Sequence, residues 1–186
     1  GAISEFVSIS GVDFDAINVH KFKTIILGQP LVESGAWRVE DENQYLKWID
    51  EYALSCQVLL KPHPFDNKKK YSSLENIEVL GTEYSAIPAE VLFGILKPNI
   101  IISTFSSAVF NYCLRYKVNG IFLACDNISP LIVDFLDDYA GSEYIDVVKS
   151  LDELGILLND LPLRMEVDDS YVECCIDEWA DLVNSS

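Results

Sequence analysis

The feature that most constrains this chain is a regular alternation of short apolar runs with helix-like segments between residues 24 and 125. The apolar runs lie at 24–27, 57–60, 77–80, 100–102 and 120–125. Gly, Pro or polar residues close several of these runs, which is typical of buried strands. Helix-like patterns separate them at 40–54, 87–96 and 108–116. Apolar strands that alternate with helices predict an α/β fold, a Rossmann-like parallel sheet with helices on both faces.

The length and composition favour a single globular domain over residues 1–186. The chain has 186 residues, of which 49% are hydrophobic and 23% charged. We expect a core over about 23–125 and an acidic C-terminal portion at 126–186 that is helical at 131–139, 151–158 and 172–183. The first residue is Gly1, not Met, so we expect a fragment or a processed protein. No transmembrane run or signal peptide is recognisable, which favours the cytoplasm.

The charge of the chain narrows its possible partners. Its formal net charge is −17, from 30 acidic and 13 basic residues, which argues against a nucleic-acid partner. Residues 126–186 hold 16 acids and only Lys149 and Arg164 as bases. An anionic ligand is therefore expected in the first two thirds of the chain, and the acidic portion serves solubility or docking.

Motifs for several common chemistries are absent from the sequence. The five cysteines show no CxxC or Cys/His spacing, so we expect free thiols and no metal site. GxGxxG, GxxxxGK[ST], HExxH and GxSxG do not occur. Dinucleotide oxidoreductases, P-loop NTPases, zincins and common serine hydrolases therefore lose support.

Polar residues cluster where predicted strands end, and this is where ligands bind in doubly wound sheets. The second strand runs into Lys61-Pro62-His63-Pro64, in which two prolines stiffen the segment. Residues two apart in an extended segment share a side, so Lys61 and His63 could face one site. An imidazole there could hydrogen-bond or protonate a leaving phosphate, or it could be a loop histidine bonded to a carbonyl.

Two further segments carry candidate ligand contacts. Ser106 and Ser107 stand where the fourth strand enters a helix, so they could cradle a phosphate or simply cap the helix. Glu90 opens the preceding helix and could accept hydrogen bonds from a ribose diol, or act as a helix-dipole acid. The run 68–70 (KKK) reads as a solvated loop that could steer an anion.

The order of these motifs resembles that of the nucleotide-sugar domain of bacterial sialyltransferases. The resemblance is closest to the lipooligosaccharide sialyltransferase and polysialyltransferase group. It rests on Lys61-Pro62-His63-Pro64 (the HP motif), Ile87-Pro88-Ala89-Glu90 and Ser106-Ser107 (the serine motif), and it covers about residues 23–125.

The resemblance implies a two-domain GT-B fold, of which this chain would be the C-terminal, nucleotide-binding half. The reaction would be inverting, metal-independent transfer of sialic acid from CMP-sialic acid to a glycan hydroxyl, with no cofactor. His63 would be the catalytic residue that stabilises or protonates the leaving CMP phosphate. The nucleotide would contact Lys61 beside the cytidine, Pro64, Glu90 at the ribose, and Ser106 and Ser107 at the phosphate.

One motif of that family is not found. Its general base lies in two acids followed by Gly, whereas Asp41-Glu42 is followed here by Asn43. The resemblance implies three partners: the nucleotide-sugar donor, a glycan acceptor and a missing N-terminal acceptor domain. The protein would be located in the cytoplasm or peripherally at the inner membrane. The alternatives are another GT-B-like nucleotide-activated transferase of capsule or cell-surface polymer synthesis, and a non-catalytic binding or assembly module.

Overall fold

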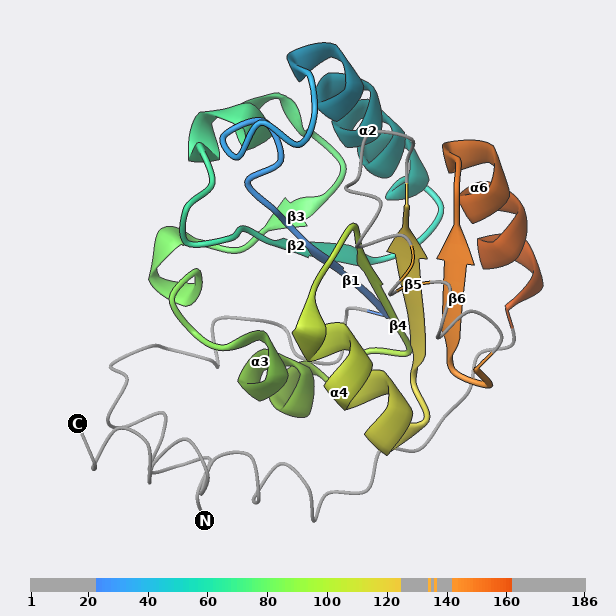
Figure 1. The fold of residues 1–186 in the computed structure, drawn as a ribbon. Helices are drawn as coiled ribbons and strands as arrows, with labels where there is room; N and C mark the ends of the chain where they lie inside the picture. Colours follow the sequence, from blue (N-terminus) through green and yellow to red (C-terminus); the bar gives the residue numbers. More distant parts are fainter. Residues whose placement is uncertain (1–22, 125–133, 135, 137–141, 162–186) are drawn as a thin grey trace.

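A six-stranded, all-parallel sheet forms the centre of the computed structural model, which describes residues 23–124, 134, 136 and 142–161 (Figure 1). The strands stand in the order β3-β2-β1-β4-β5-β6. Their bounds are β1 Thr24–Leu27, β2 Val58–Lys61, β3 Glu78–Val79, β4 Ile100–Ser103, β5 Asn119–Leu123 and β6 Ile145–Val148. The predicted Rossmann-like α/β sheet is confirmed.

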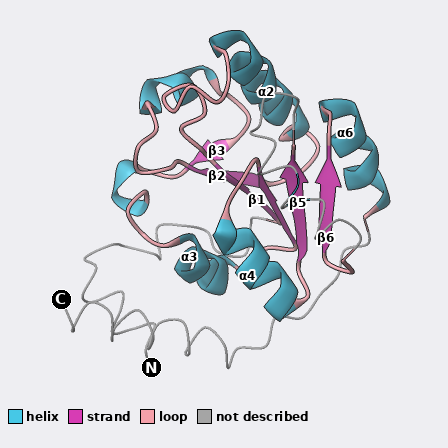
Figure 2. Ribbon diagram, viewed as in Figure 1, coloured by secondary structure: helices cyan, strands magenta, loops and turns pink. Residues whose placement is uncertain are grey.

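Helices cover both faces of this sheet. Figure 2 shows α3 and α4 together on one face and α2 and α6 on the other. Their bounds are α2 Val39–Tyr52, α3 Ala89–Leu96, α4 Ser107–Tyr116 and α6 Leu151–Asp160, with 3₁₀ turns η1 at Lys68–Ser73 and η2 at Thr82–Tyr84. Helices on both faces explain why the strands read as continuous apolar runs and not as alternating ones.

The core divides into two layers because successive strand residues point to opposite faces. In β1, Ile25 packs into the layer under α3 and α4, while Ile26 packs into the layer under α2 and α6. Ile101 and Ile102 of β4 alternate in the same way. Burial of all four side chains stabilises the centre of the sheet, at about 1.5–3 kcal/mol each.

The sixth strand corrects the sequence-based assignment of 126–186 as helical or looped. Ile145–Val148 pairs in parallel with β5, and only its first and last residues are fully buried. An edge strand buries less of its surface, so its apolar pattern is weak. The helix expected at 151–158 is confirmed as α6. The helix expected at 172–183 lies outside the described residues, and within 131–139 only positions 134 and 136, both helical, are described.

The strand order places a topological switch point between β1 and β4. Strands β2 and β3 follow β1 toward one edge, whereas β4, β5 and β6 build toward the other edge. Loops that leave the carboxyl ends of β1 and β4 therefore diverge, and a crevice forms there. None of the helices in the described ranges is long and apolar enough to cross a membrane.

Candidate functional site

A cavity of about 420 Å³ lies at the carboxyl ends of β1, β2 and β4, across the switch point. Four segments line it: 27–29 after β1, 61–64 after β2, 85–90 before and within α3, and 105–108 at the start of α4. The sequence-predicted site residues all contribute to its wall: Lys61, His63, Pro64, Glu90, Ser106 and Ser107. The topology thus brings together motifs that are up to 46 positions apart in the sequence.

His63 is half-buried, and a backbone contact orients its ring. The Phe65 amide N–H donates a hydrogen bond to His63 Nδ1 at 3.2 Å, so the proton of the neutral imidazole is on Nε2. Burial lowers the pKa of His63, and the charges of Lys61 and Lys70 act in the same direction against that of Asp66. The imidazole is therefore neutral at pH 7 and can donate a hydrogen bond through Nε2–H.

The HP motif, Lys61-Pro62-His63-Pro64, continues into a turn that Asp66 closes; we call the motif the HP segment and this turn the HP turn. The His63 amide donates to Asp66 Oδ2 at 2.7 Å, and the Asp66 amide donates back to the His63 carbonyl at 3.1 Å. The Asp66 carboxylate is buried and also accepts from Tyr71 OH at 2.5 Å. The turn is thus fixed from within the protein, on the side away from solvent.

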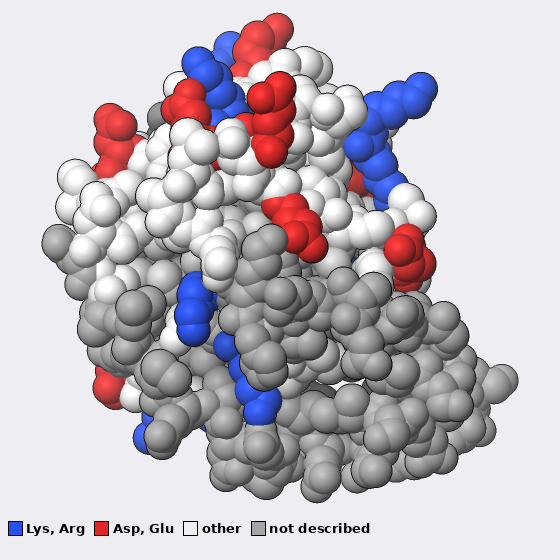
Figure 3. Space-filling model, turned by 180° about the vertical axis from the view of Figure 1, so that it is seen from behind, with Lys and Arg blue, Asp and Glu red and all other residues white. Residues whose placement is uncertain are grey.

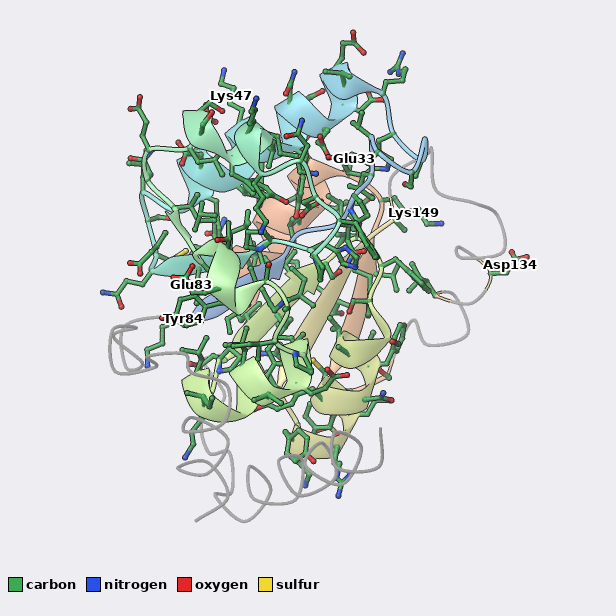
Figure 4. The ribbon with its side chains drawn as sticks, turned by 90° about the vertical axis from the view of Figure 1, so that its left-hand side faces the viewer. Glu33, Lys47, Glu83, Tyr84, Asp134 and Lys149 are labelled. Carbon is green, nitrogen blue, oxygen red and sulfur yellow. The ribbon has the colours of Figure 1, made fainter. Side chains whose placement is uncertain are left out.

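Lys70 forms the centre of a buried ion cluster, which corrects the expectation of a solvated loop at 68–70. Its side chain is 9% exposed, and its Nζ lies 2.8 Å from Glu42, 3.0 Å from Asp66 and 3.5 Å from Glu33. Figure 4 shows Glu33 close to the ribbon of α2, the helix that carries Glu42. The 3₁₀ turn points Lys70 inward while Lys69 stays exposed, a difference that composition alone does not reveal.

Lys61 contributes a buried ammonium group to the cavity wall. The residue is 6% exposed, and its Nζ donates to the backbone carbonyl of Ser85 at 3.0 Å. Burial lowers its pKa to about 8, although the charges of Glu90 and Asp66 oppose that shift. At pH 7 the group still carries its charge, and an anionic ligand in the cavity would help to compensate it.

The serine motif is not used for side-chain capping. Ser106 is the N-cap residue of α4 with an extended backbone, but its hydroxyl makes no cap hydrogen bond in the described structure. Ser107 is the first helical residue and is exposed. The Val109 amide already donates to the Ser106 carbonyl at 3.1 Å. The two hydroxyls and the N–H groups of Ser107 and Ala108, at the start of α4, therefore remain available to a ligand anion.

Glu90 stands in the first turn of α3 and lines the cavity. The helix begins at Ala89 with Pro88 as its N-cap, two positions after the start of the predicted pattern at 87–96. Ser85, just before this helix, was missed: its carbonyl accepts from Lys61 and its hydroxyl accepts from Lys68 at 3.1 Å. No local pattern marks Ser85, because its role arises only from tertiary contacts.

Gly28 is a second site residue that sequence reasoning missed. It follows β1 directly and lines the cavity. A Cβ at this position would lie 2.5 Å from Tyr71 OH and 2.8 Å from Asp66 Oδ2. A glycine at a strand end often marks such a close approach, so the Gly28-Gln29-Pro30 segment did contain a signal.

A second cavity, of about 500 Å³, lies at the carboxyl end of β5 and β6. Its wall carries two cations, Arg38 and Lys149, and two acids, Asp41 and Asp152. Arg38 pairs with Asp41 at 2.8 Å, so the charges largely offset one another. This cavity offers no cluster of unopposed donors, and we assign the candidate site to the first one.

Charges elsewhere are mixed. Figure 3 shows acidic and basic side chains interspersed over the described part of the face seen from behind.

Among the described residues, no group of three or more His, Cys, Asp or Glu side chains could hold a metal ion. Cys56 and Cys113 are free, and Cys113 is buried, which raises its thiol pKa; the other three cysteines lie outside the described residues.

Comparison with known proteins gives one family match. The sequence model of the family described as Alpha-2,8-polysialyltransferase (POLYST) matches residues 3–124. No curated protein matches. Among solved structures, the chain is similar to UDP-GlcNAc 2-epimerase of Methanocaldococcus jannaschii in complex with UDP-GlcNAc and UDP, with 13% identity and a TM-score of 0.49. That alignment covers 94% of this chain and 50% of the epimerase, so the chain spans about half the length of that protein.

Proposed function

The chain belongs to the alpha-2,8-polysialyltransferase family, and from that premise we propose that it is the donor-binding half of a sialyltransferase that takes CMP-sialic acid. The observation that supports this proposal is the convergence of three motifs on one cavity. The HP segment, Glu90 and the serine motif reach it from three separate crossovers of the sheet. In this proposal the phosphate of the nucleotide lies between His63 and Ser106, and its ribose lies toward Glu90.

The chemistry of the leaving group fits the donors in the cavity. When the bond between the sialic acid anomeric carbon and the phosphate oxygen breaks, its electron pair stays on CMP and adds a negative charge. Neutral His63 donates its Nε2–H to this phosphate, and the Ser106 and Ser107 hydroxyls and the α4 N-terminus donate as well. Pre-oriented donors of this kind stabilise the charge that develops in the transition state. This arrangement needs no metal ion.

The remaining contacts position the nucleotide. The Glu90 carboxylate accepts hydrogen bonds from the two ribose hydroxyls. Lys61, beside the cytidine, supplies a positive charge from the floor of the cavity. Pro64 is exposed in the cavity wall and contacts the nucleotide as well.

The acceptor reacts from the opposite face of the sugar, which inverts the anomeric centre. A glycan hydroxyl attacks the anomeric carbon, and its proton passes to a general base. The family's acidic base motif is not found in this sequence, so we assign the base and the acceptor site to a partner domain. Full transfer therefore requires that domain, whereas nucleotide binding does not.

Calorimetric titration of the chain with CMP, CDP and UDP tests this assignment. We expect CMP to bind most tightly, and His63→Ala to weaken it about tenfold through loss of one hydrogen bond to a charged phosphate. Lys47→Ala, at an exposed position on α2 outside the cavity wall, serves as the control and should bind CMP normally. Preference for a diphosphate would instead favour another nucleotide-activated transferase of polymer synthesis. Absence of all binding would favour a non-catalytic module.

A further inference from the structure

We propose that Asp66 is the positioning residue of this site, whose carboxylate holds the His63 backbone and thereby aims the imidazole at the ligand phosphate. The inference rests on the proposed function for the identity of the ligand. Asp66 does not line the cavity, so it acts through His63 and not by touching the nucleotide.

Asp66 binds both backbone polar groups of His63. His63 stands between Pro62 and Pro64, and a proline has no amide N–H, so the His63 N–H is the only backbone donor of the Pro-His-Pro segment. That donor is bound to Asp66 Oδ2 at 2.7 Å. With the return bond from the Asp66 amide to the His63 carbonyl at 3.1 Å, both backbone polar groups of His63 are bound to one residue.

Asp66 is itself held firmly by its neighbours. Its side chain is 0% exposed, and Tyr71 OH and Lys70 Nζ donate to its two oxygens at 2.5 and 3.0 Å. Lys70 Nζ also donates to Glu42 Oε1 of α2 at 2.8 Å, so the turn is bonded to a helix that packs on the sheet. These bonds make the turn a well-supported element, and the orientation of a catalytic group depends on such support.

The hydrogen bonds at position 66 require a carboxylate. Asp66 accepts from three donors, the His63 amide, Tyr71 OH and Lys70 Nζ, and an ionised Asp offers only acceptors. The amide group of an Asn would place N–H atoms against at least one of these donors. The charge also acts on His63, where it opposes the effects of burial, Lys61 and Lys70 on the imidazole pKa.

Three variants separate positioning from general stability. Asp66→Asn removes the charge and an acceptor, and Tyr71→Phe keeps the carboxylate but removes one of its anchors. The matched control is Asp50→Asn, because Asp50 also holds a loop by accepting from the amides of Asn76 and Ile77, at 2.9 and 3.2 Å, and is not part of the cavity wall. For each variant, CMP affinity is measured by calorimetry, the His63 titration by NMR, and the midpoint of thermal unfolding by circular dichroism.

We expect Asp66→Asn to bind CMP about tenfold more weakly and to show a lowered His63 pKa, because an attractive charge is lost. Tyr71→Phe should weaken CMP about threefold, since the support loosens while the charge remains. Asp50→Asn should leave CMP affinity and the His63 titration unchanged, although its unfolding midpoint falls. That pattern would show that the loss follows the His63 support and not stability.

A folded Asp66→Asn variant with native CMP affinity and an unchanged His63 titration would overturn the inference. Should Asp66→Asn not fold, Tyr71→Phe decides alone, and native CMP affinity in that variant is the contrary result. If the unaltered chain does not bind CMP, the proposed function fails separately. In that case a lowered His63 pKa in Asp66→Asn still supports the role of Asp66, and an unchanged one overturns it.

Discussion

The ammonium group of Lys61 is buried at the end of β2 and donates to the backbone carbonyl of Ser85 at 3.0 Å. This single contact links the HP segment to the chain that enters α3, across the candidate nucleotide cavity. Burial disfavours the charged form of Lys61, which lowers its pKa to about 8 and lowers the stability of the ligand-free protein. Stability and ligand binding therefore make opposite demands on this residue.

We expect Lys61→Met to stabilise the protein and to weaken CMP binding. The lowered pKa of Lys61 corresponds to about 3 kcal/mol of destabilisation at neutral pH, which the variant would recover. The variant also loses the hydrogen bond from Lys61 Nζ to the Ser85 carbonyl, and this loss costs it about 1 kcal/mol or more. The net gain at pH 7 should be about 1–2 kcal/mol by urea unfolding, while CMP affinity should fall about tenfold because the cavity wall loses a positive charge that attracts an anionic ligand. Lys47→Met, at an exposed position on α2, should change neither quantity appreciably.

The pH dependence of unfolding distinguishes this explanation from simple repacking. Between pH 8 and 10 the unfolded chain holds the Lys61 proton, whose ordinary pKa is 10.5, but the folded chain releases it. The unfolded state then binds more protons, so the free energy of unfolding should rise with pH across this window. Lys61→Met should lack that part of the rise. Parallel pH profiles for the two proteins would contradict the assignment.

Gly28→Ala should disturb the HP turn through the side chains that support it. The added methyl group would lie within 3 Å of Tyr71 OH and Asp66 Oδ2, and these atoms must shift to admit it. We expect a loss of about 1–3 kcal/mol in unfolding free energy together with weaker CMP binding. Gly155→Ala, within helix α6, is the matched control. Outside that helix, the added Cβ would approach only the Trp48 side chain of α2, at 3.9 Å. There we expect a gain of up to about 1 kcal/mol and native CMP affinity.

Ser106→Ala should separate ligand binding from helix capping. Replacement of a capping serine costs about 1 kcal/mol, but the Ser106 hydroxyl makes no cap hydrogen bond in the described structure. The unfolding midpoint should therefore stay nearly constant while CMP affinity falls several-fold. Ser150→Ala provides the contrast, because the Ser150 hydroxyl accepts from the Glu153 amide at 3.1 Å and caps α6. That variant should lose stability and keep its affinity for CMP.

The strands at the centre of the sheet could be predicted because both of their faces are buried. Ile100–Ile102 and Thr24–Leu27 read as strands without any tertiary information, since a parallel sheet covered on both faces requires continuous apolar runs. The edge strand Ile145–Val148 escaped notice because two of its four residues are only partly buried. The expected strand at 77–80 is reduced to Glu78–Val79 for the related reason that β3 forms the other edge.

The residues of the cavity wall could be predicted because they follow strand ends, whereas their supports could not. His63 and Ser106 stand in recognisable segments, and the strand order brings those segments together. Asp66 and Tyr71 lie in a polar stretch whose composition resembles that of a solvated loop. Their burial results from a 3₁₀ turn that folds back against α2, and no periodicity reveals so short a helix.

Lys70→Met should destabilise the protein more than any neighbouring lysine substitution. The Lys70 side chain is 9% exposed and neutralises Glu42 and Asp66, whose side chains are 8% and 0% exposed. Without the ammonium group two buried carboxylates lose the countercharge that they share, at a cost of about 3–5 kcal/mol. Lys69→Met, one position earlier on the exposed side of the same turn, should change the unfolding free energy by less than about 0.5 kcal/mol. Urea unfolding of the two variants measures the difference directly, and equal losses would mean that the buried cluster does not hold the turn in solution.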